Sequence, residues 1–367
     1  MTSSLLPEMR TAPAVFAVGN SYQIITPVKS DLLFSVTVGD KEYFDHSNGI
    51  IRSSGKIRKV TVPMDELDKA REYTVSYRKI IERRPYFPLT EEKVSTTYSF
   101  RPVEGGKINI YHISDTHGRL EAPSAAGEYF GDELSLLVLN GDLPDHSGAV
   151  ENFDLIYELC DRITGGEIPV IFSRGNHDMR GLYAESIENY TPTDMGRSYF
   201  TFRLGSLWGI VLDCGEDKPD SCEEYGYTIC CHDFRLEESA FIENVIKNAD
   251  KEYLSEGVEH RIAIAHNPFT HTSRHPFDIE QELYKKWTGY VKTMGAELVL
   301  SGHLHDTLVI NPGDPLDSQG AHCPVIVGSK PLPDGFVGCA LTLDRKNATV
   351  RFTNHEKEVL ESTDIKL

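Results

Sequence analysis

The sequence predicts an all-β region followed by a larger α/β region. Extended segments with almost no helical periodicity fill the chain up to residue 102, whereas apolar strands alternate with amphipathic helices from residue 108 onward. A single hydrophobic core seldom serves 367 residues, so the length also favours two domains. We predict that these domains comprise residues 1–103 and residues 107–367.

Gly, Asn and Asp turns separate the extended segments of the N-terminal region. The segments cover residues 15–26, 32–38, 57–62, 73–80 and 95–100. Short strands in this arrangement are typical of an antiparallel β-sandwich. Residues 67–73 resemble the turn and tyrosine corner of fibronectin type III domains, in which a Tyr hydroxyl bonds to upstream backbone. We therefore expect an all-β domain like those of immunoglobulins or fibronectin type III.

Pro102, Gly105 and Gly106 interrupt both patterns and favour a domain boundary just before a strongly apolar strand. Beyond it, a helix is expected over residues 236–254. Apolar residues recur there at helical spacing, namely Phe241, Val245, Ala249 and Tyr253. Strands and helices in alternation indicate a layered α/β domain.

Five apolar strands of the second domain each precede a cluster of polar side chains. The expected strands cover residues 108–113, 134–139, 169–172, 262–265 and 298–300. The clusters contain, in order, Asp115 with His117, Asp142 with Asp145, Asn176 with His177, His266, and His303 with His305. Ligand sites of open α/β sheets lie beyond the carboxyl ends of the strands, so we expect these side chains to share one site.

The side chains of these clusters suit a metal site. Carboxylate, imidazole and amide oxygen without thiolate favour Mn, Fe or Zn. Residues two apart on an extended chain point the same way, so Asp115 with His117, and His303 with His305, could each present two ligands. Glycines precede three of the clusters, where a tight turn would bring the backbone close to the ions.

The blocks DxH, GDxxD, GNHD, a lone His and GHxH follow one another in this order. They resemble the calcineurin-like metallophosphoesterase family over about residues 107–350. The resemblance implies a four-layer α/β/β/α domain that binds two metal ions of the Mn, Fe or Zn type. It implies that the ligands of the first ion are Asp115, His117, Asp142 and His305. For the second ion it implies Asn176, His266 and His303, with Asp142 bridging.

The resemblance also implies a reaction. In that family a hydroxide held between the ions attacks phosphorus, while the metals neutralise charge on the phosphoryl oxygens. His177 matches the residue that protonates the leaving oxygen, and Asp145 matches the carboxylate that orients it. The expected activity is therefore hydrolysis of phosphomonoesters or phosphodiesters by a binuclear metal-dependent phosphoesterase.

Departures from the family pattern narrow this expectation. Purple acid phosphatases would have Tyr at the position of Asp145. Because that Tyr is absent, we expect no purple charge-transfer colour and therefore a pale protein. Ser/Thr protein phosphatases would place Arg at His146 and Glu at Asp178, which disfavours a dedicated protein phosphatase.

Charge and composition bear on partners and location. A formal charge of -19 would repel nucleic acid and anionic membranes, so neither is an expected partner. A small-molecule phosphoester is the expected substrate, and bound divalent ions would supply the local positive field that attracts it. No apolar stretch reaches membrane-spanning length, and the apolar run at residues 14–18 is too short for a signal peptide. Seven cysteines without metal-ligand spacing are expected to be free thiols of a cytoplasmic protein. The sequence leaves the oligomeric state open.

Two other functions fit the same sequence. A partner-binding protein could use the N-terminal domain for recognition and keep a non-catalytic metal site, although such a site would need neither His177 nor Asp145. A metal-dependent nuclease would share the fold and the ligands, and the net acidity counts against it.

Residues 214–235 form a segment too long for a simple turn and are expected to overhang the site. Side chains that could reach a substrate are Tyr225, Phe234 and Arg235 in this segment, and His271, Arg274 and His275 after His266. Arg174 is expected to pair with a nearby carboxylate.

Overall fold

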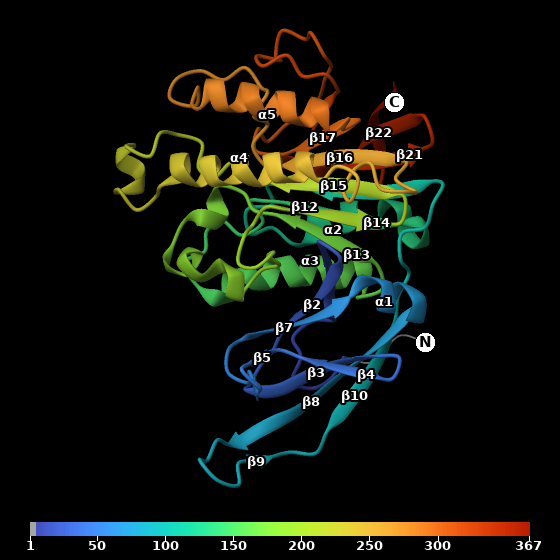
Figure 1. The fold of residues 1–367 in the computed structure, drawn as a ribbon, viewed down its shortest axis with the longest axis vertical. Helices are drawn as coiled ribbons and strands as arrows, with labels where there is room; N and C mark the ends of the chain where they lie inside the picture. The colour runs from blue at the N-terminus through green and yellow to red at the C-terminus, as the bar shows by residue number, and fades with distance from the viewer. Residues whose placement is uncertain (1–4) are drawn as a thin grey trace.

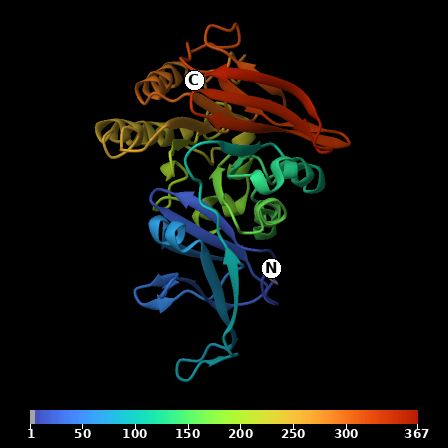
Figure 2. The same cartoon turned by 90° about the vertical axis from the view of Figure 1, so that its right-hand side faces the viewer.

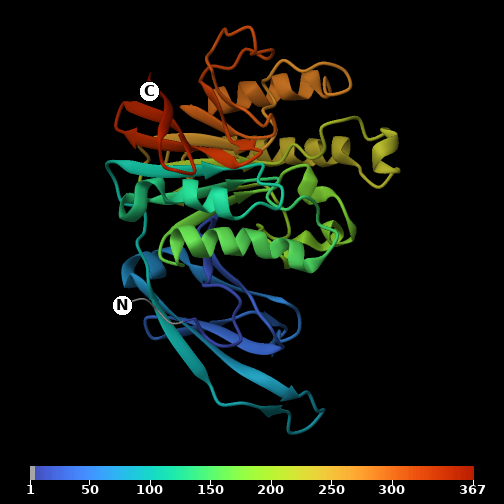
Figure 3. The same ribbon diagram turned by 180° about the vertical axis from the view of Figure 1, so that it is seen from behind.

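Two β-sheets lie face to face, and helices cover both outer faces (Figure 1). The computed structural model describes residues 5–367. Helices α2 (Glu121–Gly127) and α3 (Asp154–Thr164) cover one sheet, and α4 (Cys231–Lys247) and α5 (Gln281–Thr293) cover the other. This arrangement confirms the four-layer α/β/β/α fold, and Figure 3 shows the α2 and α3 side.

The larger sheet has ten strands. Nine of them follow in the order β23 (Val359–Lys366), β22 (Asn347–Asn354), β21 (Gly335–Asp344), β11 (Ile108–Ile113), β12 (Leu136–Asn140), β13 (Pro169–Ser173), β1 (Ala14–Val18), β2 (Ser21–Pro27) and β7 (Ile57–Pro63). The tenth, β20 (Lys330–Leu332), pairs with β21. Strands β11, β12, β13 and β1 run parallel, so the first three end at one edge.

The second sheet has six strands and carries the other two polar clusters. Its order is β14 (Phe200–Leu204), β15 (Leu207–Leu212), β16 (His260–Ala265), β17 (Leu298–Ser301), β19 (Val325–Gly328) and β18 (Thr307–Ile310). Strands β15, β16, β17 and β19 are parallel. The sheet therefore brings the ends of β16 and β17 side by side.

The N-terminal region is all-β apart from the short helix α1 (Met64–Ala70). Its own sheet has the order β10 (Val94–Ser99), β8 (Glu72–Glu82), β3 (Leu32–Val38) and β4 (Lys41–Phe44), and β9 (Leu89–Thr90) pairs with β8. A small hairpin joins β5 (His46–Ser47) to β6 (Ile50–Ile51). Figure 2 shows these strands at one end of the molecule and the C-terminal strands at the other.

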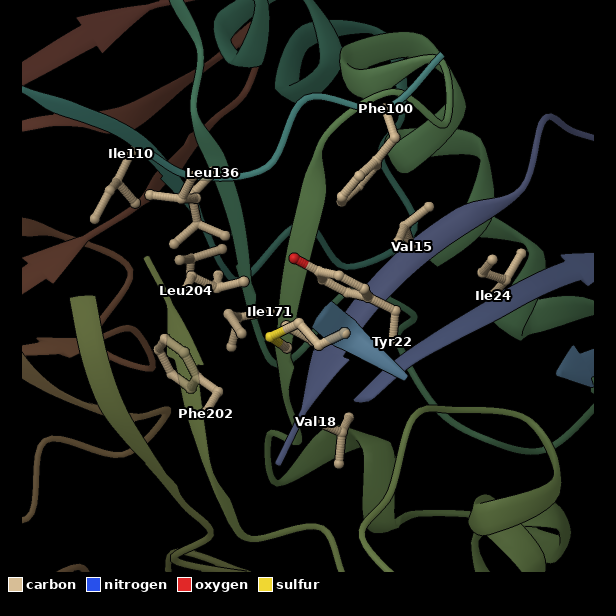
Figure 4. Close-up of a cluster of buried hydrophobic side chains, with 14 of the residues drawn as sticks. Val15, Val18, Tyr22, Ile24, Phe100, Ile110, Leu136, Ile171, Phe202 and Leu204 are labelled. Carbon is tan, nitrogen blue, oxygen red and sulfur yellow. The ribbon is translucent and has the colours of Figure 1, made fainter. Parts of the chain in front are cut away.

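The N-terminal region and the α/β layers share a sheet and a core. Strand β1 pairs parallel with β13, with Val15 opposite Pro169 and Phe16 opposite Val170. Buried side chains from both parts form one cluster, shown in Figure 4, that includes Val15, Tyr22, Ile24, Phe100, Ile110, Leu136, Ile171, Phe202 and Leu204. The division into residues 1–103 and 107–367 therefore stays a prediction about units that fold on their own.

Three local expectations change in the structure. The segment 15–26 is a hairpin of β1 and β2 that turns at Gly19, whose φ of 57° suits glycine. The hydroxyl of Tyr73 donates to the carbonyl of Gly166, 2.8 Å away, and not to upstream backbone as a tyrosine corner would. Helix α4 ends at Lys247, where the Asn248 side chain donates to the carbonyl of Asn244 at 2.8 Å.

All seven cysteines are free. Among the helices of the described residues, none is both long and apolar enough to cross a bilayer.

Candidate metal centre

The ends of the five strands converge, and the predicted ligands meet there. Three groups of side chains have ligand atoms that all lie within 4.8 Å of one another. The groups are Asp115 with His117 and His305, His117 with Asp142 and His177, and Asp142 with His266 and His303. The seventh predicted ligand, Asn176, places its amide oxygen 3.0 Å from Nδ1 of His303.

The backbone reaches this arrangement through left-handed conformations. Asp115, His117, Asp142, His303 and His305 all have positive φ, between 44° and 69°. Such conformations are costly for residues other than glycine and cluster at functional sites. The pairs two apart therefore converge, but not because the chain is extended as we had expected. The turns that follow β11 and β17 aim both side chains of each pair inward.

Glycines allow two of these turns to touch. A Cβ on Gly141 would lie 2.5 Å from the backbone nitrogen of Gly175, and a Cβ on Gly175 would lie 2.2 Å from Oδ1 of Asp142. No side chain fits in either place. The predicted close approach of the backbone is thus a feature of the site, and it holds the Asp142 and Asn176 turns together.

His266 provides the strongest evidence that a cation belongs here. Its Nδ1 donates to the carbonyl of Asn140 at 2.6 Å, so the neutral ring has a lone pair on Nε2. That Nε2 is buried without a hydrogen-bond partner, 3.2 Å from Oδ2 of Asp142 and 3.8 Å from Oδ1 of Asp115. A lone pair facing two carboxylates is repelled unless a positive charge lies between them. These residues therefore fit a bound metal ion.

A second set of acceptor atoms converges beside it. The amide oxygen of Asn176 lies 3.0 Å from Nδ1 of His303 and 3.3 Å from Oδ2 of Asp142. A cation would satisfy all three atoms. Without one, the amide would form more hydrogen bonds with its NH2 group turned toward His303 and Asp142. This donor set, too, is typical of a metal site.

The pKa values of these groups reflect burial and mutual attraction in the absence of metal. Burial opposes the charged form of His266, but the carboxylates of Asp142 and Asp115 raise its pKa to about 10. Burial opposes ionisation of Asp142 as well, but His266 holds the pKa of Asp142 below its usual range. Burial lowers the pKa of His303 to about 4, which favours the neutral ring that a metal requires.

His177 lies at the edge of the centre. Its Nδ1 donates to the main-chain carbonyl of Asp145 at 2.9 Å, whereas the Asp145 carboxylate is 3.8 Å from that nitrogen. The same carboxylate lies 3.4 Å from Nδ1 of His117, and its side chain is 67% exposed. In this structure the main chain of Asp145 orients His177, so a role for the carboxylate stays a prediction.

Arg180 was not among the predicted site residues. Its Nη1 lies 3.2 Å from Nε2 of His177. The buried carboxylate of Glu216 holds the guanidinium through two hydrogen bonds, at 2.8 and 2.9 Å. An arginine three residues after the histidine of the GNHD block, in an acidic chain, is the signal that could have identified it.

The 214–235 segment reaches the centre through a residue that we had not singled out. Oδ2 of Asp217 lies 3.6 Å from Nε2 of His303, and the Tyr225 hydroxyl donates to Oδ1 of Asp217 at 2.9 Å. A carboxylate at this position favours the proton on Nε2 and leaves Nδ1 of His303 free for a metal. The expected overhang is therefore present, with Tyr225 supporting Asp217.

Two arginines have structural partners. Arg235 is 1% exposed and donates to the carbonyls of Cys214 and Glu216, so it supports the segment from inside and does not face a substrate. Arg174 forms the expected ion pair, with its Nε 2.6 Å from Oδ2 of Asp213.

A cavity of about 370 Å³ opens beside the metal centre. His303 and Asp217 lie in its wall on the side of the centre, and His271 and Arg274 are also lining residues, as expected from the sequence. Aromatic side chains complete the wall, namely Phe269, Phe277 and Tyr284.

Comparisons with known proteins agree with this geometry. A family model described as calcineurin-like phosphoesterase matches residues 108–307. A purple acid phosphatase from yellow lupin (Lupinus luteus) seeds has a similar fold, with a TM-score of 0.57 and 14% identity over 97% of this chain and 74% of its own. The structure of PhoD is similar at a TM-score of 0.55 and 12% identity, over 98% and 90% of the two chains.

At such identities the two structures show the fold alone, and their fold extends over the N-terminal region. No curated protein matches the sequence significantly. The family model covers more than half of the chain and includes all seven predicted ligands. The protein therefore belongs to the calcineurin-like phosphoesterase family.

Proposed function

We propose that the protein hydrolyses phosphomonoesters or phosphodiesters with two metal ions bound at the candidate centre. The observation that carries this proposal is the bare, buried Nε2 of His266 between the carboxylates of Asp142 and Asp115. Family membership supports the hydrolase class.

The groups of ligand atoms support an assignment to two ions. Asp142 is grouped with His117 on one side and with His266 and His303 on the other, so it lies within reach of ligands proposed for both ions. Asp115, His117 and His305 would hold one ion with Asp142, and the other would be held by Asn176, His266 and His303. Manganese, iron and zinc all suit this mixed oxygen and nitrogen set.

When bound, divalent ions lower the pKa of a coordinated water and neutralise charge on phosphoryl oxygens. The side chains around the centre complement this chemistry. The Asp145 carbonyl holds the proton on Nδ1 of His177, and Nε2 accepts from Nη1 of Arg180. To protonate the leaving oxygen, Nε2 would have to exchange this contact for a proton. Arg180, fixed by Glu216, lies beside that atom and would attract a phosphate oxygen.

The cavity lined by His271 and Arg274 would hold the leaving group of a small phosphoester. Its aromatic walls favour an apolar group, and Arg274 could bind an acceptor on it. The free cysteines support the proposal that the protein works in a reducing compartment, the cytoplasm.

Hydrolysis of p-nitrophenyl phosphate and bis(p-nitrophenyl) phosphate tests the proposal. The metal-stripped protein would be assayed before and after Mn²⁺ is restored. We expect turnover only with metal, and the preferred ester distinguishes a monoesterase from a diesterase. Absence of turnover with every metal of the Mn, Fe and Zn group, in protein that elemental analysis shows to be loaded, would instead favour a partner-binding protein with a non-catalytic site.

A further inference from the structure

A second cavity, of about 540 Å³, lies between the N-terminal strands and the catalytic layers. Residues 44–46, 52, 54–59 and 61 line it from the N-terminal side, and Glu188, Asn189 and Tyr190 line it from the other. It contains none of the predicted metal ligands. It is therefore distinct from the metal centre and from the cavity beside it.

The feature that singles out this cavity is the buried guanidinium of Arg58. The residue is only 7% exposed. Nε donates to the carbonyl of Ile57 and Nη2 to that of Ser54, but Nη1 is buried without a partner. Within the described part of the chain, no carboxylate forms an ion pair with Arg58. An unpartnered donor of a buried charged group is costly, and the carboxylates of Asp45 and Asp31 attract this charge without forming an ion pair with it.

The loop before Arg58 is shaped around this side chain. Gly55 has a φ of 107°, and a Cβ at this position would lie 2.9 Å from Nη2 of Arg58. The backbone conformation requires glycine, and the missing side chain lets the end of Arg58 lie close to the loop. The carbonyls of Ser54 and Ile57 hold the guanidinium in place, which leaves Nη1 as the nitrogen without a partner.

Other cations surround the same cavity. Arg52, Lys56 and Lys59 line it together with Arg58, against the carboxylates of Asp45 and Glu188. The cavity thus has four cationic and two anionic side chains, whereas the whole chain has a formal charge of -19. The cavity is therefore positive in an acidic protein.

Lys59, Arg52 and Lys56 differ in whether their charged groups already have partners in the protein. Nζ of Lys59 donates to the carbonyls of Glu188 and Thr191 at 2.6 Å, and burial lowers its pKa to about 8. Nε of Arg52 lies 3.2 Å from Oδ1 of Asp45, which neutralises part of its charge. Lys56 is exposed at the cavity, so its Nζ is open to a ligand, whereas Nη1 of Arg58 is a buried donor that a ligand could reach only if the side chain shifts.

We infer that this cavity binds a phosphate group, either as the free ion or as part of a small phosphorylated molecule. Arginine and lysine together suit phosphate oxygens, which accept several charge-assisted hydrogen bonds. The cavity exceeds the size of a phosphate ion, and Phe44 and Tyr190 provide apolar wall for an attached group. The ligand would contact both the N-terminal strands and the 3-10 segment Leu182–Asn189, which follows His177 in the chain.

Binding to the full chain without metal tests this inference independently of the proposed function. The metal-stripped protein would be titrated calorimetrically with inorganic phosphate and, separately, with adenosine monophosphate at constant ionic strength. We expect saturable binding. Tighter binding of the nucleotide identifies a phosphorylated molecule as the ligand, whereas binding of phosphate alone identifies the free ion.

Variants locate the binding. We expect Arg58→Met to weaken binding at least tenfold and Lys56→Gln to weaken it several-fold, because each removes a cation from the cavity. Lys69→Gln, an equal charge change at an exposed lysine of α1 outside the cavity, should bind like the natural protein. If Arg58→Met does not fold, the double variant of the exposed Arg52→Gln and Lys56→Gln replaces it. No binding beyond that of chloride, or equal binding by the cavity variants and the Lys69 control, would overturn the inference.

Discussion

Nε2 of His266 lies 3.2 Å from Oδ2 of Asp142, and both residues are almost completely buried. Because Nδ1 of His266 donates to the carbonyl of Asn140, the facing atoms of the two side chains both carry lone pairs when the ring is neutral. Either a proton or a metal ion must lie between them. Without metal a proton lies there, because the carboxylates of Asp142 and Asp115 raise the pKa of His266 to about 10, and a metal ion would displace that proton on binding.

Substitution of Asp142 tests the bridging role. Asp142→Asn removes a charge that two of the three groups of ligand atoms share, so we expect loss of most of both ions. Elemental analysis of the purified protein measures this directly. Asp145→Asn, which alters a carboxylate that is 67% exposed and in none of the groups, is the matched control and should keep its metal. A full metal content in Asp142→Asn would rule out the bridge.

His177→Ala separates catalysis from metal binding. We expect the variant to keep its ions, because the other ligands remain, and to lose turnover by roughly 10²- to 10⁴-fold, the usual contribution of a general acid. The measurement is kcat for a p-nitrophenyl ester together with metal content. Unchanged kcat would exclude His177 as the acid, and loss of metal would make it a ligand, as its place in one group allows.

The buried side chain of His112 should make the free energy of unfolding depend on pH. Burial lowers its pKa to about 3, from 6.5, and its Nε2 accepts from the Asn140 side chain at 3.0 Å. Between about pH 3 and pH 6.5, His112 carries a proton in the unfolded chain but not in the folded chain. The free energy of unfolding should therefore fall as pH falls through this window, by up to about 1.4 kcal/mol per pH unit from this residue.

His112→Gln keeps an acceptor for Asn140 and removes the titration. Urea unfolding of the metal-stripped protein between about pH 4 and pH 7 should then show a smaller slope in the variant. Equal slopes in the two proteins would show that His112 does not determine this pH dependence.

Removal of the N-terminal region tests the predicted domain division. A fragment of residues 107–367 lacks β1, which pairs with β13 and buries Val15 and Phe16 against the catalytic layers. The exposed edge and apolar surface should make the fragment largely insoluble. Soluble yield and thermal unfolding measure the effect. A soluble fragment that melts like the full chain would establish two independent domains.

Much of the fold could be predicted because strands and motifs leave local signals. The expected strands 108–113, 169–172 and 262–265 match β11, β13 and β16 closely, since buried parallel strands are continuous apolar runs. The N-terminal hairpin was harder to predict. Nothing in residues 14–18 reveals that they would join the catalytic sheet beside β13, because strand pairing depends on distant partners.

The sequence by itself determined which side chains could bind metal. The chemistry of these side chains and their positions just after apolar strands can be read from the local sequence. The order of the five motifs along the chain then identifies the family. Only the tertiary structure decided that Arg180 lies beside His177, that Asp217 lies beside His303, and that Nη1 of Arg58 is buried without a hydrogen-bond partner. Contacts between residues far apart in the chain, and the burial of a charge, depend on how all the layers pack, and no local pattern records them.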